Sequence, residues 1–114
     1  MYALKNKVQL IGNLGNAPEI KSIESGKKMA RFSIATNENY RNAKGEKVTE
    51  TTWHNLVAWG KVADLAEKFL QKGTEVVIEG KLINRSYTDK DGIKKYISEV
   101  QVNELLLLNG KPQA

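Results

Sequence analysis

Residues 53–73 read WHNLVAWGKVADLAEKFLQKG, and within them the spacing of apolar side chains changes from two to about four. Alternate side chains of an extended strand share a face, so Trp53 and Trp59 point the same way, with Asn55 and Val57 between them. From residue 61 onward, apolar residues recur every three or four positions, as on one face of a helix. The stretch therefore predicts a strand at 49–59 followed by a helix at 61–71. The helix stripe consists of Val62, Leu65, Ala66, Phe69 and Leu70.

The segments on either side of this stretch read as strands. Residues 29–36 alternate, with Ala30, Phe32 and Ile34 on one apolar face. The polar, Asn-rich residues 37–47 form a long loop or the tips of a hairpin. Glycine and aspartate at 88–92 predict a hairpin turn, and Gly73 suits the end of the helix. The remaining strands are expected at 8–14, 75–87 and 93–108, with a short extended piece at 19–22.

Five main strands with one helix between the third and fourth is the order of an OB-fold, a five-stranded Greek-key barrel. The alternative is another small barrel with an incidental helix, and the position of the helix favours the OB-fold. We therefore predict an all-β protein with one helix. Its barrel domain spans residues 1–109, and residues 110–114 form a short polar end.

Composition restricts the classes of protein that the chain can belong to. Its 114 residues suffice for one domain, and 18 Lys and Arg against 13 Asp and Glu give a formal charge of +5. A positive excess suits a polyanionic partner, although many proteins match it without binding nucleic acid. There is no cysteine and one histidine, so disulfides and thiolate metal sites are excluded, and we expect no metal and no cofactor. Nothing resembles a signal peptide or a membrane span, which predicts a cytoplasmic, nucleoid-associated protein.

The tryptophan face has two interpretations. Two large rings on one face of a basic protein suggest a surface on which nucleic-acid bases stack. Buried aromatic residues more commonly fill cores, so this segment alone supports a core strand equally well.

A collinear set of short motifs runs from residue 6 to residue 103. The motifs are NKVQLIGNLG at 6–15 followed by Pro18-Glu19, FSIATN at 32–37, TWH at 52–54, WGK at 59–61, LQKG at 70–73, IEGKL at 78–82 and YTD at 87–89 with Gly92. No single motif is specific, but their order is, and in this order the chain resembles bacterial single-stranded DNA-binding proteins.

The resemblance implies a non-catalytic OB-fold homotetramer that wraps single-stranded DNA during replication, recombination and repair. Four family positions stack bases through aromatic rings, and the matching residues here are Tyr40, Trp53, Trp59 and Tyr87. The enterobacterial pattern at these positions is Trp, Trp, Phe and Trp. All four positions stay aromatic here, but a tyrosine ring is smaller than a tryptophan ring, so Tyr40 and Tyr87 should stack less strongly.

Phosphate contacts are expected from basic residues interleaved with these rings, because a non-specific binder must hold both bases and backbone. Each of these residues could equally be a solvated surface charge. Lys72 has the weakest case, since a lysine near a helix end already has a favourable interaction with the helix dipole. The candidates are Arg31, Arg41, Lys61, Lys72 and Arg85.

Three further features carry expectations. Tyr96 alternates with Ser98 and Val100, which favours packing. His54 faces away from the tryptophans, and the family resemblance puts it near a subunit contact. The first strand is apolar on both faces, at Val8, Leu10 and Ile11, which suits burial between subunits or a strand covered on both sides within one subunit.

The end of the chain departs from the family. Family members usually carry a long tail with an acidic, phenylalanine-bearing tip that recruits replication and repair enzymes, whereas this chain ends KPQA at 111–114. Either a tail is missing or the chain is a short member, so tail-mediated recruitment does not carry over, and replication and repair proteins stay open as partners.

Two rival functions remain open beside single-stranded DNA binding. A phosphodiester-cleaving enzyme needs clustered carboxylates to hold a metal, and the acidic residues here are scattered. A dimeric primosomal module or an RNA-binding OB-fold module shares the fold and the charge. The four-aromatic set favours single-stranded DNA.

Overall fold

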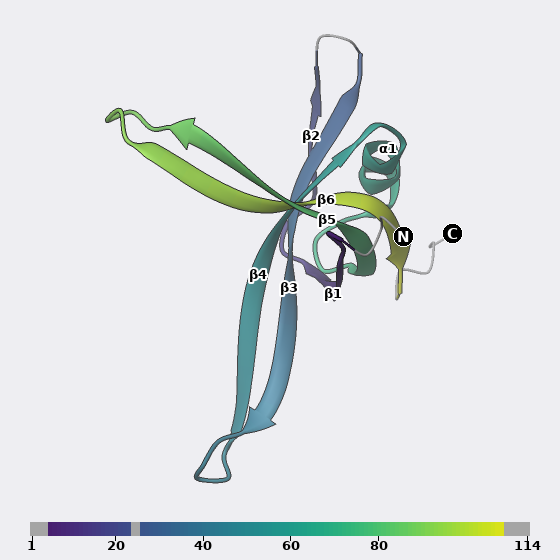
Figure 1. Ribbon diagram of the computed structural model, residues 1–114. Coiled ribbons are helices and arrows are strands. Elements are labelled where there is room, and N and C mark those ends of the chain that lie inside the picture. Colours follow the sequence, from purple (N-terminus) through teal and green to yellow (C-terminus); the bar gives the residue numbers. More distant parts are fainter. Residues whose placement is uncertain (1–4, 24–25, 109–114) are drawn as a thin grey trace.

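The computed structural model describes residues 5–23 and 26–108, which form a strand barrel with one helix (Figure 1). The expected boundary at residues 109–110 lies outside this range. In the described part, no helix has the length and apolarity to cross a membrane. The elements are β1 (Val8–Leu14), β2 (Glu19–Ser22), β3 (Lys28–Arg41), β4 (Lys47–Trp59), α1 (Gly60–Phe69), β5 (Glu75–Thr88) and β6 (Lys94–Leu107).

The strands are ordered β1-β5-β6-β4-β3-β2, and an additional pairing of β1 with β3 closes the barrel. The β4–β6 pairing is parallel, and the other pairings are antiparallel. Strand β2 lies outside the barrel, paired with the start of β3. The closed barrel thus has five strands, with the helix between the third and fourth of them along the chain. The predicted OB-fold is confirmed.

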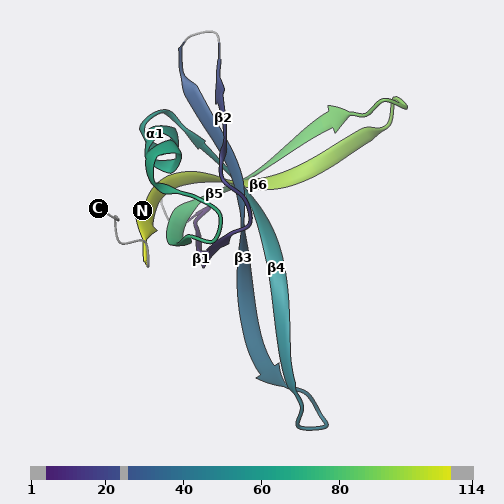
Figure 2. The same ribbon diagram turned by 180° about the vertical axis from the view of Figure 1, so that it is seen from behind.

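Two long hairpins project from the barrel in different directions (Figures 1 and 2). The β3–β4 arm, residues 36–52, turns at 42–46, so of the two expectations for residues 37–47, a long loop or the tips of a hairpin, the structure has the hairpin tips. The β5–β6 arm, residues 82–98, turns at 89–93, close to the predicted position. Both arms keep unbroken pairing to their ends, which fixes the face on which each of their side chains lies.

The core lies inside the barrel and follows the predicted alternation on β3. Ala30, Phe32 and Ile34 are all buried. Gly80 has a steric reason to be glycine, because a Cβ atom there would lie 2.0 Å from the carbonyl oxygen of Gln101. The register shift between Glu79 and Gly80 marks this close crossing of β5 and β6. The largest fully buried side chains are Ile34, Leu56, Val76 and Ile78.

The helix buries a narrower stripe than the sequence predicts. Ala63, Ala66 and Leu70 are buried, whereas Leu65 and Phe69 of the expected stripe are exposed. The helix packs across β3, β4 and β6, and close packing there is made by the two alanines. Gly73 does not end the helix, which stops at Phe69; instead, Gly73 lies in the turn at 71–74.

Candidate nucleic-acid interface

The outer face of β3 and β4 places the two tryptophans at opposite ends of one strand segment. The register pairs Trp53 with Ala35 and Trp59 with Met29. Six residues of extended chain separate the rings by roughly 20 Å. Trp53 is 58% exposed and Trp59 is 36% exposed, so neither is a core residue. Val57, on the same face by alternation, is buried where β4 pairs with β6.

Trp53 lies against the chain segment that leaves β1. A Cβ atom built on Gly15 would come within 2.6 Å of Cζ3 and 2.9 Å of Cη2 of the indole ring. Any larger residue at position 15 would therefore collide with the ring. Gly15 thus allows the indole to rest on the backbone while most of its surface stays open to solvent.

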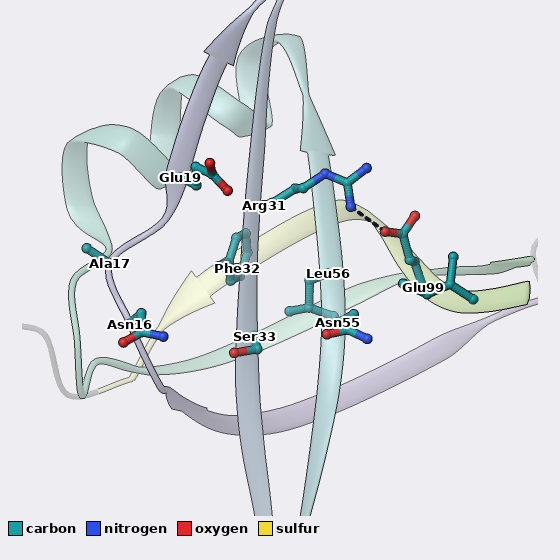
Figure 3. A pocket seen from close by; sticks show the side chains of 10 residues that line it. Asn16, Ala17, Glu19, Arg31, Phe32, Ser33, Asn55, Leu56 and Glu99 are labelled. Carbon is teal, nitrogen blue, oxygen red and sulfur yellow. Dashed lines mark hydrogen bonds and ion pairs between the residues drawn. The ribbon is translucent and has the colours of Figure 1, made fainter. Parts of the chain in front are cut away.

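A groove of about 300 Å³ lies on this outer face, and Arg31, Ser33 and Asn55 are among its lining residues (Figure 3). Its walls combine amide, hydroxyl and charged groups with a few apolar side chains, a surface suited to a polar, charged ligand. The lining residues are Asn16, Ala17, Glu19, Arg31, Phe32, Ser33, Asn55, Leu56, Ile97 and Glu99.

Glu99 joins two of the predicted phosphate-binding arginines in this groove. Its side chain is 2% exposed and accepts a hydrogen bond of 2.5 Å from Nη1 of Arg31. Arg85 donates to both carboxylate oxygens, from Nε at 2.9 Å and from Nη2 at 3.1 Å. The bonds from Arg85, together with those from Arg31, hold the pKa of Glu99 below its ordinary value against the opposing effect of burial.

Arg31 and Arg85, together with Glu99, keep a net positive charge and N–H donors that Glu99 does not use. One carboxylate serves two guanidinium groups, and each guanidinium has five N–H donors. Glu99 receives one donor from Arg31 and two from Arg85. Arg31 and Arg85 are therefore held in place rather than freely solvated. Their role toward phosphate remains a prediction.

Tyr40 and Arg41 lie near the tip of the β3–β4 arm, and both are exposed. The unbroken ladder puts Arg41 on the same ribbon face as Trp53, and Tyr40 on the opposite face. Arg41 also donates from Nη1 to the carbonyl oxygen of Gly45, across the turn. A nucleic-acid strand that touched both Tyr40 and Trp53 would have to pass over an edge of the arm.

Tyr87 and Arg85 share one face of the β5–β6 arm, as predicted, and Tyr87 is exposed. Tyr96 contradicts its prediction. It is 74% exposed on the other face of the arm, opposite Ser86. Tyr96 does share a strand face with Val100, but β6 enters the barrel only after residue 98. Tyr96 therefore lies on the projecting arm, where no described residue covers its ring.

The two lysine candidates are exposed at opposite ends of the helix. Lys61 is its second residue and follows Trp59 closely. Lys72 lies in the turn whose Gly73 N–H donates to the carbonyl oxygen of Leu14, next to Gly15. Within residues 5–23 and 26–108, neither lysine forms an ion pair. The same residues contain no cluster of acidic and histidine side chains suited to a metal ion.

Sequence reasoning missed Glu99, Gly15 and the exposure of Tyr96. The last strand holds two acids, Glu99 and Glu104, and nothing in the sequence alone marks Glu99 as the buried one. Gly15 carries no signal by itself, because its role appears only when Trp53 folds over it.

The sequence model of the single-strand binding protein family matches residues 5–108. The chain belongs to this family. It is 44% identical over 107 residues to "Single-stranded DNA-binding protein 1" of Chlorobaculum tepidum, covering 93% of this chain and 66% of the relative. It is 39% identical over 106 residues to "Single-stranded DNA-binding protein" of Neisseria meningitidis, covering 93% of this chain and 61% of the relative.

A solved family structure has the same fold. The chain titled "Plasmodium falciparum SSB complex with ssDNA" superposes with a TM-score of 0.82 at 36% identity, covering 91% of this chain and 95% of that chain. The predicted resemblance is therefore confirmed. This chain covers less than two thirds of the length of the two curated relatives named above, at 66% and 61%.

Proposed function

We propose that this chain binds single-stranded DNA without sequence preference and without catalysing a reaction. The observation that carries the proposal is the outer face of β3 and β4, where two exposed tryptophans flank a polar groove that Arg31 helps to line. Every base has a flat face, so stacking on these rings tolerates any sequence. The relatives named single-stranded DNA-binding proteins, and the relative solved with single-stranded DNA, support the same function.

The proposed path of the strand uses all nine predicted contacts. Bases stack on the four rings, and the cations neutralise phosphates between them, with counterion release making the affinity depend on salt. Replication, recombination and repair are the processes that expose such strands, which would place the protein with the chromosome in the cytoplasm. The stacking residues are Tyr40, Trp53, Trp59 and Tyr87, and the cations are Arg31, Arg41, Lys61, Lys72 and Arg85.

Self-association into a homotetramer is supported by two surfaces of β1. On one edge, β1 pairs with β5 along residues 8–13, but on the other it pairs with β3 only at Asn13 and Leu14. An open edge invites pairing with the same strand of a second copy. A groove of about 610 Å³ lies beside this edge, lined by Gln9, Leu10, Ile11, Thr36, Glu38, Thr52 and His54.

The second surface is an apolar row across the outside of β1, β5 and β6. Ile11 pairs with Val77, and Val77 pairs with Leu106. Ile11 and Leu106 are exposed, whereas Val8 and Leu10 pack against the core. Two different self-complementary surfaces are what a symmetric tetramer requires. His54, whose Nε2 lies 3.0 Å from Oγ1 of Thr36, would then line the first interface.

The test is a titration of tryptophan fluorescence with oligo(dT) at low and high salt, with duplex DNA and oligo(U) as competitors. Strong quenching that duplex and RNA fail to reverse supports the proposal. Equal competition by duplex, or no quenching, overturns it, and preference for oligo(U) indicates the RNA-binding alternative. Sedimentation of the free protein separates a tetramer from the dimer expected of a primosomal module.

A further inference from the structure

The β5–β6 arm has two faces, and the proposed function uses only one of them. Alternation along its ladder puts Arg85, Tyr87 and Lys95 on one face. Tyr96 and Lys94 lie on the other face, together with Ser86. Because the arm projects from the barrel, both faces are open to the surroundings (Figures 1 and 2).

Tyr96 is the most exposed of the large hydrophobic side chains in the described residues. It is 74% exposed, against 36% to 58% for the four predicted stacking residues. The amine of Lys94 lies over one side of the Tyr96 ring, 5.8 Å from its centroid. A ring with a cation on one side offers the two contacts that a nucleotide requires, the opposite side of the ring for the base and a positive charge for the phosphate.

Apart from the exposed Leu82 where the arm meets the barrel, the rest of this face is polar, and its described strand positions carry no carboxylate. It presents the hydroxyls and amide of Asn84, Ser86, Thr88 and Ser98, and Ser98 donates to Asn84 across the ladder at 2.8 Å.

The acidic residues of the arm lie elsewhere. Glu99 points to the Tyr87 side, where it binds Arg85. Asp89 accepts the backbone N–H groups of Asp91 and Ile93 within the turn. The charge on the Tyr96 face, supplied by Lys94, therefore favours an anionic ligand.

We propose that the Tyr96 face binds a second segment of single-stranded DNA, with a base stacked on Tyr96 and a phosphate on Lys94. The strand would then contact both sides of the β5–β6 arm instead of crossing it once at Tyr87. This inference rests on the proposed function, because it extends the same kind of contact to a new face.

The deciding experiment combines photocrosslinking with substitution in the full chain. Oligo(dT) containing 5-iododeoxyuridine is crosslinked to the protein, and the modified peptides are located by mass spectrometry. Binding of long oligo(dT) is then measured for Tyr96→Ala and Tyr96→Phe. Phe69→Ala is the matched control, because Phe69 is an exposed aromatic residue on the helix, away from both arms.

The proposal requires an adduct on Tyr96 and a loss of affinity of about fivefold or more for Tyr96→Ala, with Tyr96→Phe and Phe69→Ala close to the unmodified chain. It is overturned if Tyr96 carries no adduct, or if Tyr96→Ala binds as tightly as the unmodified chain. A loss shared by Tyr96→Phe also overturns it, since the ring would then not be the contact. A change in sedimentation of free Tyr96→Ala would assign the residue to a contact between copies instead.

The same experiment separates this proposal from the proposed function. Adducts on Trp53 or Trp59 without one on Tyr96 leave the proposed function intact and reject the second face. Absence of adducts on every aromatic residue rejects both.

Discussion

The outer face of β3 and β4, called the wall below, and the β5–β6 arm both pair aromatic rings with cations, but they hold them differently. On the wall, Trp53 is seated on Gly15, and Arg31 is tied to the buried Glu99. On the arm, Tyr87 and Tyr96 extend into solvent from a two-stranded ribbon. Contacts that are already positioned lose little conformational entropy on binding. The wall should therefore supply most of the binding free energy, and the arm should extend the length of strand that is covered.

The largest expected effect is on the wall. Trp53→Ala and Trp59→Ala should each weaken oligo(dT) binding by about 1–3 kcal/mol, because each removes a stacking platform. Tyr87→Ala on the arm should lose less, since its ring is smaller and less firmly held. Titration of all three variants checks the ranking, and sedimentation should show an unchanged oligomer. A larger loss for Tyr87→Ala would reverse the comparison.

Glu99 tests whether the wall is held by its ion pairs. Glu99→Gln should lower the free energy of unfolding by about 1–3 kcal/mol at pH 7, because a buried charged hydrogen-bond acceptor for two arginines is lost. Since the pKa of Glu99 is lowered in the folded state, its stabilising contribution is complete above the ordinary carboxyl pKa of 4.5 and is lost as the pH falls below it.

Denaturant unfolding of both proteins from pH 7 to pH 3 makes the measurement. The two stabilities should converge as the pH falls. A difference that stays constant over this range would mean that Glu99 acts through packing and not through its charge.

Gly15→Ala tests whether the position of the Trp53 ring on Gly15 matters for binding, and its expected effect is smaller. Gly15→Ala should push the indole off the β1–β2 connection, since the added Cβ would lie 2.6 Å from the ring. We expect a shifted tryptophan emission in the free protein and an affinity loss of about 1 kcal/mol or less, below that of Trp53→Ala. Unchanged emission and affinity would show that the ring adapts without loss.

The smallest effects belong to single lysines. Lys61→Gln should reduce the slope of log affinity against log salt by about 0.7, the share of one phosphate on a single strand. Lys72→Gln should change it by the same amount only if the strand reaches the turn after the helix. Lys21→Gln, on β2, serves as the charge-matched control. Equal slopes for all three variants would deny specific phosphate contacts to both candidates.

The sequence predicted what depends on neighbouring residues, and missed what depends on distant ones. Strand alternation placed Phe32 in the core, and the helix and both hairpin turns were correctly located. The buried stripe of the helix was wrong at Leu65 and Phe69, because the barrel end, and not the helix, decides which side chains are covered.

The site shows the same division. The four predicted stacking residues are exposed, but the shared carboxylate joins Arg31 of β3, Arg85 of β5 and Glu99 of β6. Residues so far apart in the chain have no common pattern in the sequence. Tyr96 was misjudged because alternation leads to burial only inside the barrel. Where the barrel ends along β6 is set by tertiary structure.

The closure of the barrel has a consequence for its motions. Each arm is held by a long ladder of paired residues, but the barrel is closed by two short strand pairings, which we call seams. The β1–β3 seam has two residue pairs, Asn13 with Ala35 and Leu14 with Ile34. The parallel β4–β6 seam also has two, Leu56 with Val100 and Val57 with Gln101.

Local opening begins where few backbone hydrogen bonds must break. Amide hydrogen exchange should therefore be faster at the seams than in the middle of β3 paired with β4. Transient unsealing would change the angle between the arms without unfolding either one, so the barrel would act as a hinge for the surfaces it carries.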